Sequence, residues 1–256
     1  MPFTFSHPAL VVPLLYTHRR YKWLSATGLI IGSMAPDAEK FLRLKLASQH
    51  SHTIGSIFYF SCPISVGLAF IFHMLVRQPL IKHLPALLYR RVDRYTNFDW
   101  PNYFRQHTWG VLLSIVIGAA SHLFWDSFTH DNTLMTSSVL ESVDLVQLGD
   151  KSMPLWQFVA LLSSIIGALV ISYTVWRMPV SVTNDVPRVS AVLRYWGIVA
   201  IVSALLETAW IVTVHPRWLN MGISTISTMM LAILIVSIYT NWRTKTQQAG
   251  FISKAV

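Results

Sequence analysis

The chain has 256 residues and a formal net charge of +9, and 53% of its residues are hydrophobic while only 12% are charged. Soluble domains carry about 25% charged residues, so this composition excludes an ordinary soluble domain and indicates a polytopic membrane protein. The Lys and Arg residues lie in loops between apolar runs. We therefore expect the lipid bilayer as the partner and no nucleic acid.

The N-terminal segment, residues 1–53, contains two apolar runs that are too short to cross a membrane. We expect short helices that lie at the membrane interface or pack on the bundle and contribute site residues. Pro36, Asp37 and Glu39 favour the start of one such helix. Gly28 and Gly32 form a GxxxG pattern, which is typical of close helix packing.

Five later apolar runs are long enough to span the bilayer, which needs about 20 helical residues. They cover residues 54–76, 109–128, 155–176, 193–214 and 222–242. The sequence thus predicts an all-α, polytopic helical membrane protein. It forms one integral-membrane domain over residues 1–256, with a five-helix bundle within 54–242 and a short basic tail at 243–256.

Alternating spans place the start of the first span and the end of the second on the same membrane face, together with the N-terminal segment. Several residues of metal-ligand type then converge on that face: His7, Asp37, His50, His52, His122, Asp126 and His130. His50 and His52 are too close in sequence to be distinguished. Because Cys62 is the only cysteine, any metal site must use His and carboxylate ligands.

The second span carries the most informative spacing. His122 and Asp126 are four residues apart, so they lie on one helical face, and His130 can join them if the helix continues. This spacing favours a metal site, although a direct hydrogen bond between His122 and Asp126 without a metal would use the same pattern.

Two carboxylates near the apolar region need partners. Asp126 would cost on the order of 3 kcal/mol there, and it could bridge two metal ions. Glu207 lies about seven residues, roughly 10 Å, from the end of the fourth span, at a similar depth. It is a candidate extra ligand, ligand-orienting residue or general base.

The motifs MPFTFSHPA, GSMAPDAEKFLR, HSHT and SHLFWDSFTH closely resemble a bacterial membrane family, domain of unknown function 4184. The resemblance covers most of the chain and implies a multi-pass protein of the bacterial inner membrane. A more distant resemblance is to membrane-bound metal-dependent hydrolases and to the zinc phospholipase C and single-strand nuclease superfamily. It implies six metal ligands, namely His7, Asp37, His52, His122, Asp126 and His130. The later HxxxE pair of the soluble enzymes is absent, so one or two metal ions are expected.

The leading hypothesis is a membrane-embedded hydrolase that uses a divalent metal, zinc, to cleave a phosphoester such as a lipid headgroup. Asp126 and Glu207 are its candidate catalytic carboxylates. The anionic substrate would be bound by three basic residues, Arg19, Arg20 and Arg43. The alternative is a non-enzymatic membrane protein whose His and Asp residues form a structural or ion-handling cluster.

Overall fold

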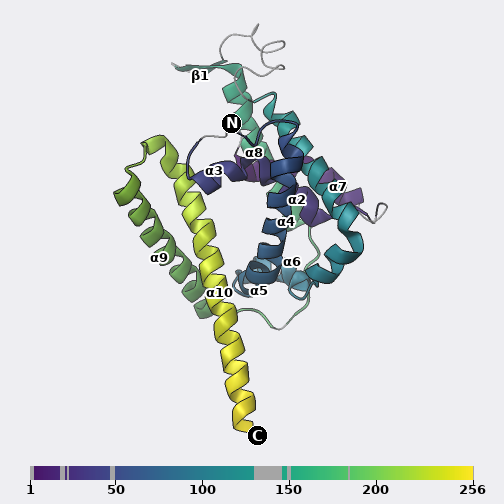
Figure 1. The fold of residues 1–256 in the computed structure, drawn as a ribbon, viewed down its shortest axis with the longest axis vertical. Coiled ribbons are helices and arrows are strands. Elements are labelled where there is room, and N and C mark those ends of the chain that lie inside the picture. Colours follow the sequence, from purple (N-terminus) through teal and green to yellow (C-terminus); the bar gives the residue numbers. More distant parts are fainter. Residues whose placement is uncertain are drawn as a thin grey trace. The chain divides into compact units, whose positions relative to one another are not determined.

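Helices form nearly all of the regular structure in the computed structural model, which describes residues 3–17, 21, 23–46, 50–129, 146–148, 151–183 and 185–255 (Figure 1). The N-terminal helices are η1 (Thr4–Ser6), α1 (Pro8–Thr17), α2 (Ala26–Met34), η2 (Ala35–Asp37) and α3 (Ala38–Arg43). A second set comprises the π-helical η3 (Ile57–Ser61), α4 (Cys62–Ile71), the π-helical η4 (Phe72–Val76), α5 (Arg77–Lys82), α6 (Ala86–Val92) and η5 (Asp93–Tyr95).

The remaining elements are α7 (Trp100–Asp126), the strands β1 (Val146–Leu148) and β2 (Lys151–Met153), α8 (Leu155–Trp176), α9 (Val189–Val214), η7 (Trp218–Asn220) and α10 (Met221–Ala255). The two strands pair antiparallel, with Gln147 opposite Ser152. The all-α class predicted from the composition is therefore confirmed.

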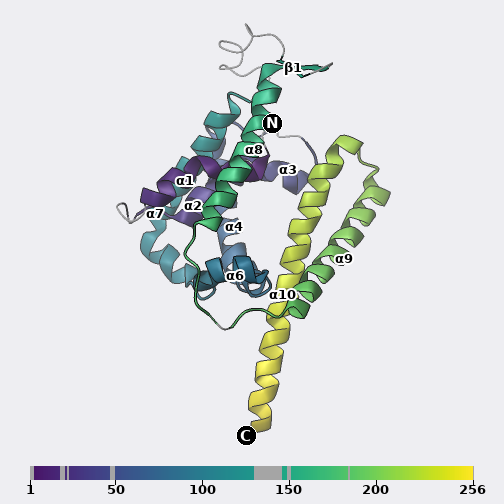
Figure 2. The same cartoon turned by 180° about the vertical axis from the view of Figure 1, so that it is seen from behind.

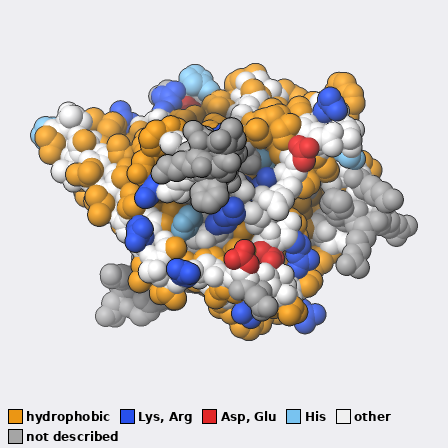
Figure 3. Space-filling model, turned by 90° about the horizontal axis from the view of Figure 1, so that it is seen from below, with side chains coloured by type: hydrophobic (Ala, Val, Ile, Leu, Met, Phe, Trp, Pro, Cys, Tyr) orange, Lys and Arg blue, Asp and Glu red, His pale blue; other side chains and the backbone are white. Residues whose placement is uncertain are grey.

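Within the described residues, five helical segments are long and apolar enough to cross a membrane: Ile57–Lys82, Trp100–Asp126, Leu155–Trp176, Val189–Val214 and Trp218–Gln247. In the third segment only 11% of the most apolar stretch is buried. A soluble protein would bury such a surface, so its exposure fits contact with lipid. Figure 3 shows hydrophobic side chains over much of the face that it draws, with Lys and Arg scattered among them.

The predicted and observed spans agree in number and order, but only the third has the predicted bounds, and the start of the second differs most. Helix α7 begins at Trp100 instead of residue 109, so the residues before the apolar run also belong to the helix. The backbone departs from helical geometry at His107, with φ −126° and ψ 27°, so this early part is joined to the span through a kink.

By its internal contacts the chain divides into two compact units. The first contains Met1–Glu39, Ser48–Ala69 and Phe104–Arg177, and the second contains Lys40–Ala47, Phe70–Tyr103 and Met178–Val256. The single domain expected from the sequence stays a prediction.

The N-terminal helices of the first unit pack against its long helices. Helix α2 begins at the N-cap Ser25, whose hydroxyl accepts a hydrogen bond from the backbone N–H of Gly28. A Cβ added at Gly28 would lie 2.8 Å from the Val111 carbonyl oxygen, and one at Gly32 would lie 2.5 Å from that of Ile115. The predicted close packing at these glycines is confirmed, and it holds α2 against α7.

Helix α8 approaches the first turn of the chain equally closely. A Cβ on Gly167 would lie 2.6 Å from Cβ of Ser6. The Ser164 hydroxyl accepts a hydrogen bond from the backbone N–H of Phe3, and the Ser6 hydroxyl donates one to the Ser164 carbonyl. These contacts fix η1, and therefore the position of His7, which follows η1 directly.

In the second unit, α9 and α10 form an antiparallel hairpin whose two helices lie side by side in both ribbon views (Figures 1 and 2). Its buried apolar contacts join Tyr195 and Val199 of α9 to Ala232 and Val236 of α10. The Tyr195 and Ser237 hydroxyl oxygens lie 2.9 Å apart, which adds a polar contact between the same helices.

Candidate metal centre

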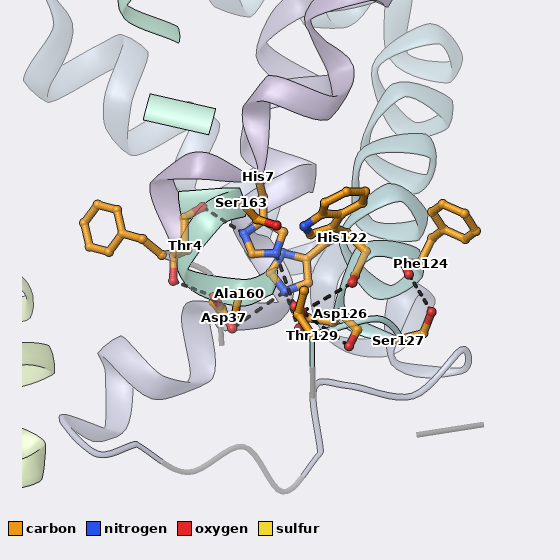
Figure 4. Close-up of polar contacts among 12 residues, drawn as sticks. Thr4, His7, Asp37, His122, Phe124, Asp126, Ser127, Thr129, Ala160 and Ser163 are labelled. Carbon is orange, nitrogen blue, oxygen red and sulfur yellow. Dashed lines mark hydrogen bonds and ion pairs between the residues drawn. The ribbon is translucent and has the colours of Figure 1, made fainter. Parts of the chain in front are cut away.

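Five side chains from four separate segments of the first unit meet in what we call the His/Asp cluster. Its members are His7 after η1, Asp37 of η2, His52 of the loop before η3, and His122 and Asp126 of α7. Figure 4 shows His7 and His122 side by side, with Asp37 and Asp126 below the two rings and Phe124 directed away.

Four of these residues form a compact group. Asp37, His52, His122 and Asp126 each offer one ligand atom, and these atoms all lie within 4.8 Å of one another. Nε2 of His122 lies 3.2 Å from Oδ2 of Asp126, and Nε2 of His52 lies 3.3 Å from Oδ1 of Asp37 and 3.4 Å from Oδ2 of Asp126. A group of this composition and size could hold a metal ion.

His7 contacts the opposite oxygen of the shared carboxylate. Its Nε2 lies 3.3 Å from Oδ1 of Asp126, and its ring stacks on that of His122 with the ring centroids 3.8 Å apart. Asp126 therefore lies among three imidazole rings, with Oδ1 toward His7 and Oδ2 toward His52 and His122.

The tautomer of His122 is set by the backbone of α2. Nδ1 of His122 lies 2.7 Å from the carbonyl oxygen of Ser33. Because a carbonyl can only accept, Nδ1 carries a proton, and Nε2 of the neutral ring presents a lone pair. This Nε2 forms no hydrogen bond with the described residues, although it faces carboxylate oxygens of Asp126 at 3.2 Å and of Asp37 at 3.7 Å.

The other two imidazoles are also held at Nδ1. Nδ1 of His7 lies 3.3 Å from the carbonyl oxygen of Thr4, and Nδ1 of His52 lies 2.9 Å from the hydroxyl of Ser51. Imidazole ligands of metal ions commonly use one ring nitrogen for the metal and the other for such an orienting partner. All three rings thus direct Nε2 toward the carboxylates.

Two further contacts fix the carboxylate and loop positions. The Thr4 hydroxyl donates to Oδ2 of Asp37, which leaves Oδ1 facing the imidazoles. Oε2 of Glu39 accepts hydrogen bonds from the backbone N–H groups of His50 and Ser51, at 3.1 and 3.0 Å. Glu39 thereby holds the loop that carries His52.

Burial makes the charge of the cluster costly unless it is balanced. His122 and Asp37 are fully buried, and Asp126 is 5% exposed. Two carboxylates removed from water need positive charge nearby, either protonated imidazoles or a bound cation. A direct histidine–carboxylate network and a metal site both satisfy that need, but they differ in what occupies the space between the Nε2 and carboxylate atoms.

The structure brings together five of the six predicted metal ligands. It also separates the two neighbouring histidines, since His52 lies in the cluster whereas His50 is exposed. The sixth ligand, His130, lies outside the described residues, as do Arg19 and Arg20. The α7 helix ends at Asp126, before His130.

Glu207 and Arg43 belong to the second unit. Glu207 accepts hydrogen bonds from the hydroxyls of Ser224 at 2.6 Å and Thr228 at 3.2 Å, both in α10. Arg43 is the last residue of α3 and is exposed. Their roles in catalysis and substrate binding stay predictions.

Sequence patterns did not identify the residues that support the cluster, which are Thr4, Ser33, Ser51 and Glu39. Ser33 contributes a backbone carbonyl, which no residue pattern identifies. Thr4 and Glu39 lie three residues before His7 and two after Asp37, and such proximity to a candidate ligand is the one signal that could have identified them.

The fold and the cluster define an all-helical protein with the features of an integral membrane protein and a buried candidate metal centre. The chain belongs to the family described as domain of unknown function (DUF4184), whose model matches residues 1–241. No curated protein and no solved structure matches the chain.

Proposed function

We propose that the His/Asp cluster binds a divalent cation, zinc, and that the protein is a hydrolase of phosphoesters in the bacterial inner membrane. The observation that carries the proposal is the arrangement around His122. The neutral form of His122 that donates from Nδ1 to the Ser33 carbonyl presents the lone pair of Nε2 to two carboxylates. A lone pair and an anion repel each other, whereas a cation between them attracts both.

The donor types support zinc. Imidazole nitrogen and carboxylate oxygen are common zinc ligands, and catalytic zinc sites keep a position open for water or substrate. His52, His122, Asp37 and Asp126 would hold the ion, and His7 would lie on the far side of Asp126. The second oxygen of Asp126 could bind a second ion together with His7, as expected for a bridging carboxylate.

A divalent cation supplies Lewis-acid polarisation of a phosphoryl oxygen and lowers the pKa of water. Where a single ion is bound, the oxygen of Asp126 that does not hold it would orient the attacking water and accept its proton. The water oxygen would bond to phosphorus as the ester P–O bond breaks, and the departing alkoxide would take the proton held by Asp126 and leave as the alcohol. The basic residues Arg19, Arg20 and Arg43 remain the candidates for contact with the phosphate.

Elemental analysis of the protein purified in detergent tests metal binding. The parent, after zinc loading and removal of free metal, should retain about one equivalent or more, while His122→Ala and Asp126→Ala should retain little. His50→Ala is the matched control, because His50 is an exposed neighbour of His52, and it should keep full metal. Less than about 0.2 equivalents of any divalent metal in the parent would overturn the proposal.

The catalytic part needs a separate assay. The zinc-loaded parent should release p-nitrophenol from bis-p-nitrophenyl phosphate, or phosphate-containing products from a panel of phospholipids, and Asp126→Ala should not. Full metal content without hydrolysis of any phosphoester would instead favour the non-enzymatic alternative, a structural or ion-handling cluster.

A further inference from the structure

A partly open cavity of about 330 Å³ adjoins the cluster in the first unit. Its walls come from α1, α7 and α8, including Leu10, Trp125, Val159 and Ile166. Small-molecule sites have volumes of about 300–1,000 Å³, so this cavity can hold a ligand segment. Its lining is apolar apart from Ser6, His7 and Ser163.

The cavity and the cluster share one residue, His7, whose side chain is buried. His7 lines the cavity, and its Nε2 lies 3.3 Å from Oδ1 of Asp126. Ser163 of α8, which Figure 4 also draws, is another polar residue that lines this cavity. A ligand in the cavity therefore lies against His7, the residue that connects the cavity to the cluster.

The lining residues of α8 form a stripe along the helix. They recur at intervals of three or four between Val159 and Val170, so they lie on one face over roughly 16 Å of helix. Helix α8 starts at the membrane face where α7 ends at Asp126, because consecutive spans alternate in direction. The stripe thus runs from the level of the cluster toward the middle of the bilayer.

The opening of the cavity also faces an apolar environment. Leu162 and Ile166, which line it, are 44% and 50% exposed. They belong to the span of which only 11% is buried in its most apolar stretch. In a bilayer, the molecules in contact with such residues are lipids.

From this geometry we infer that the cavity receives one acyl chain of a glycerophospholipid whose phosphoester lies at the His/Asp cluster. An acyl chain is apolar and linear, and it runs from the headgroup toward the bilayer centre, as the cavity does. The inference rests on the proposed function for the reacting group, and it names glycerophospholipids as the substrate class.

The test is photocrosslinking in phosphatidylcholine vesicles that contain a glycerophospholipid with a diazirine near the end of one acyl chain. Mass spectrometry of the labelled peptides should place the label on α8 and α1. The variant Ile166→Trp should lower labelling of these peptides at least about fivefold by filling the cavity. Ile165→Trp is its matched control, because Ile165 is 52% exposed and does not line the cavity.

Val159→Trp is a second variant that should fill the cavity, and Val159 is a half-buried lining residue. Unchanged labelling in both cavity variants, or an equal decrease in Ile165→Trp, would overturn the acyl-chain site. Zinc content measured on the same samples separates the two proposals. Full zinc with no cavity-dependent labelling rejects the acyl-chain site alone, whereas cavity-dependent labelling without zinc rejects the metal centre alone.

Discussion

Each unit places a carboxylate in an apolar helical segment. The groups that surround this carboxylate differ between the two units. In the second unit, Glu207 of α9 accepts hydrogen bonds from hydroxyls of α10, those of Ser224 and Thr228. In the first unit, Asp126 faces Nε2 of His122, whose proton is on the other nitrogen. Hydroxyl donors satisfy a carboxylate without any further group, whereas a buried carboxylate beside imidazole nitrogens needs either a protonated ring or a bound cation.

This difference shows that intramembrane carboxylates cannot be assigned from sequence depth alone. Both Asp126 and Glu207 fall within apolar segments and raise the same energetic problem. The Glu207 contacts join α9 to α10, which is what a polar contact between membrane helices commonly does. The Asp126 contacts join residues from three segments around one small volume, which is typical of a binding site.

Metal removal should give the largest loss of stability, and this loss should come from the first unit. A ligand at about 1,000 times its Kd stabilises the folded state by about 4 kcal/mol. We therefore expect a chelator to lower the unfolding temperature of the zinc-loaded protein in detergent, and to leave that of Asp126→Asn unchanged. An equal response of parent and variant would show that the stabilising metal is bound elsewhere.

Gly167→Ala should shift the position of His7, because it disturbs the contact between α8 and η1. The added Cβ would lie 2.6 Å from Cβ and 2.8 Å from the carbonyl oxygen of Ser6. Overpacking of this kind costs about 1–3 kcal/mol, measurable as a lower unfolding temperature. Gly197→Ala is the control, since nothing lies within 4 Å of its added Cβ; a similar loss there would discount the contact with Ser6.

Thr4→Val removes the hydroxyl that holds Asp37 while keeping the side-chain shape. Loss of a hydrogen bond that orients a metal ligand lowers metal affinity about 10–100-fold, which zinc titration against a competing chelator can measure. Thr17→Val serves as the control because the Thr17 hydroxyl donates only to the local Leu14 carbonyl. Equal affinity in Thr4→Val and the parent would show that Asp37 needs no support from Thr4.

Glu207→Gln should give the smallest effect. The amide oxygen can still accept from the hydroxyls of α10, and hydrogen bonds between membrane helices average about 0.6 kcal/mol. We expect unchanged zinc content and a decrease in stability of less than about 1 kcal/mol. A marked loss of zinc would instead support the role of Glu207 as a ligand, and a loss of hydrolysis alone would support its role as a general base.

The features that depend on local periodicity were predictable. The third span, Leu155–Trp176, matches its predicted bounds because hydropathy and helix length specify it directly. The same holds for His122 and Asp126, since a spacing of four residues places both on one face of any helix. Alternation of the spans predicted that His52 would lie at the same end of the bundle as these two residues, and His52 does contact Asp126.

By itself, then, the sequence determined the membrane class, the five spans and the residue types that can meet at one end of the bundle. Only the tertiary structure decided which atoms face one another. Ser33 sets the tautomer of His122 across 89 positions of sequence, and Gly167 sets the position of η1. Such contacts depend on how closely distant helices pack, and local residue patterns carry no information about the separation of their backbones.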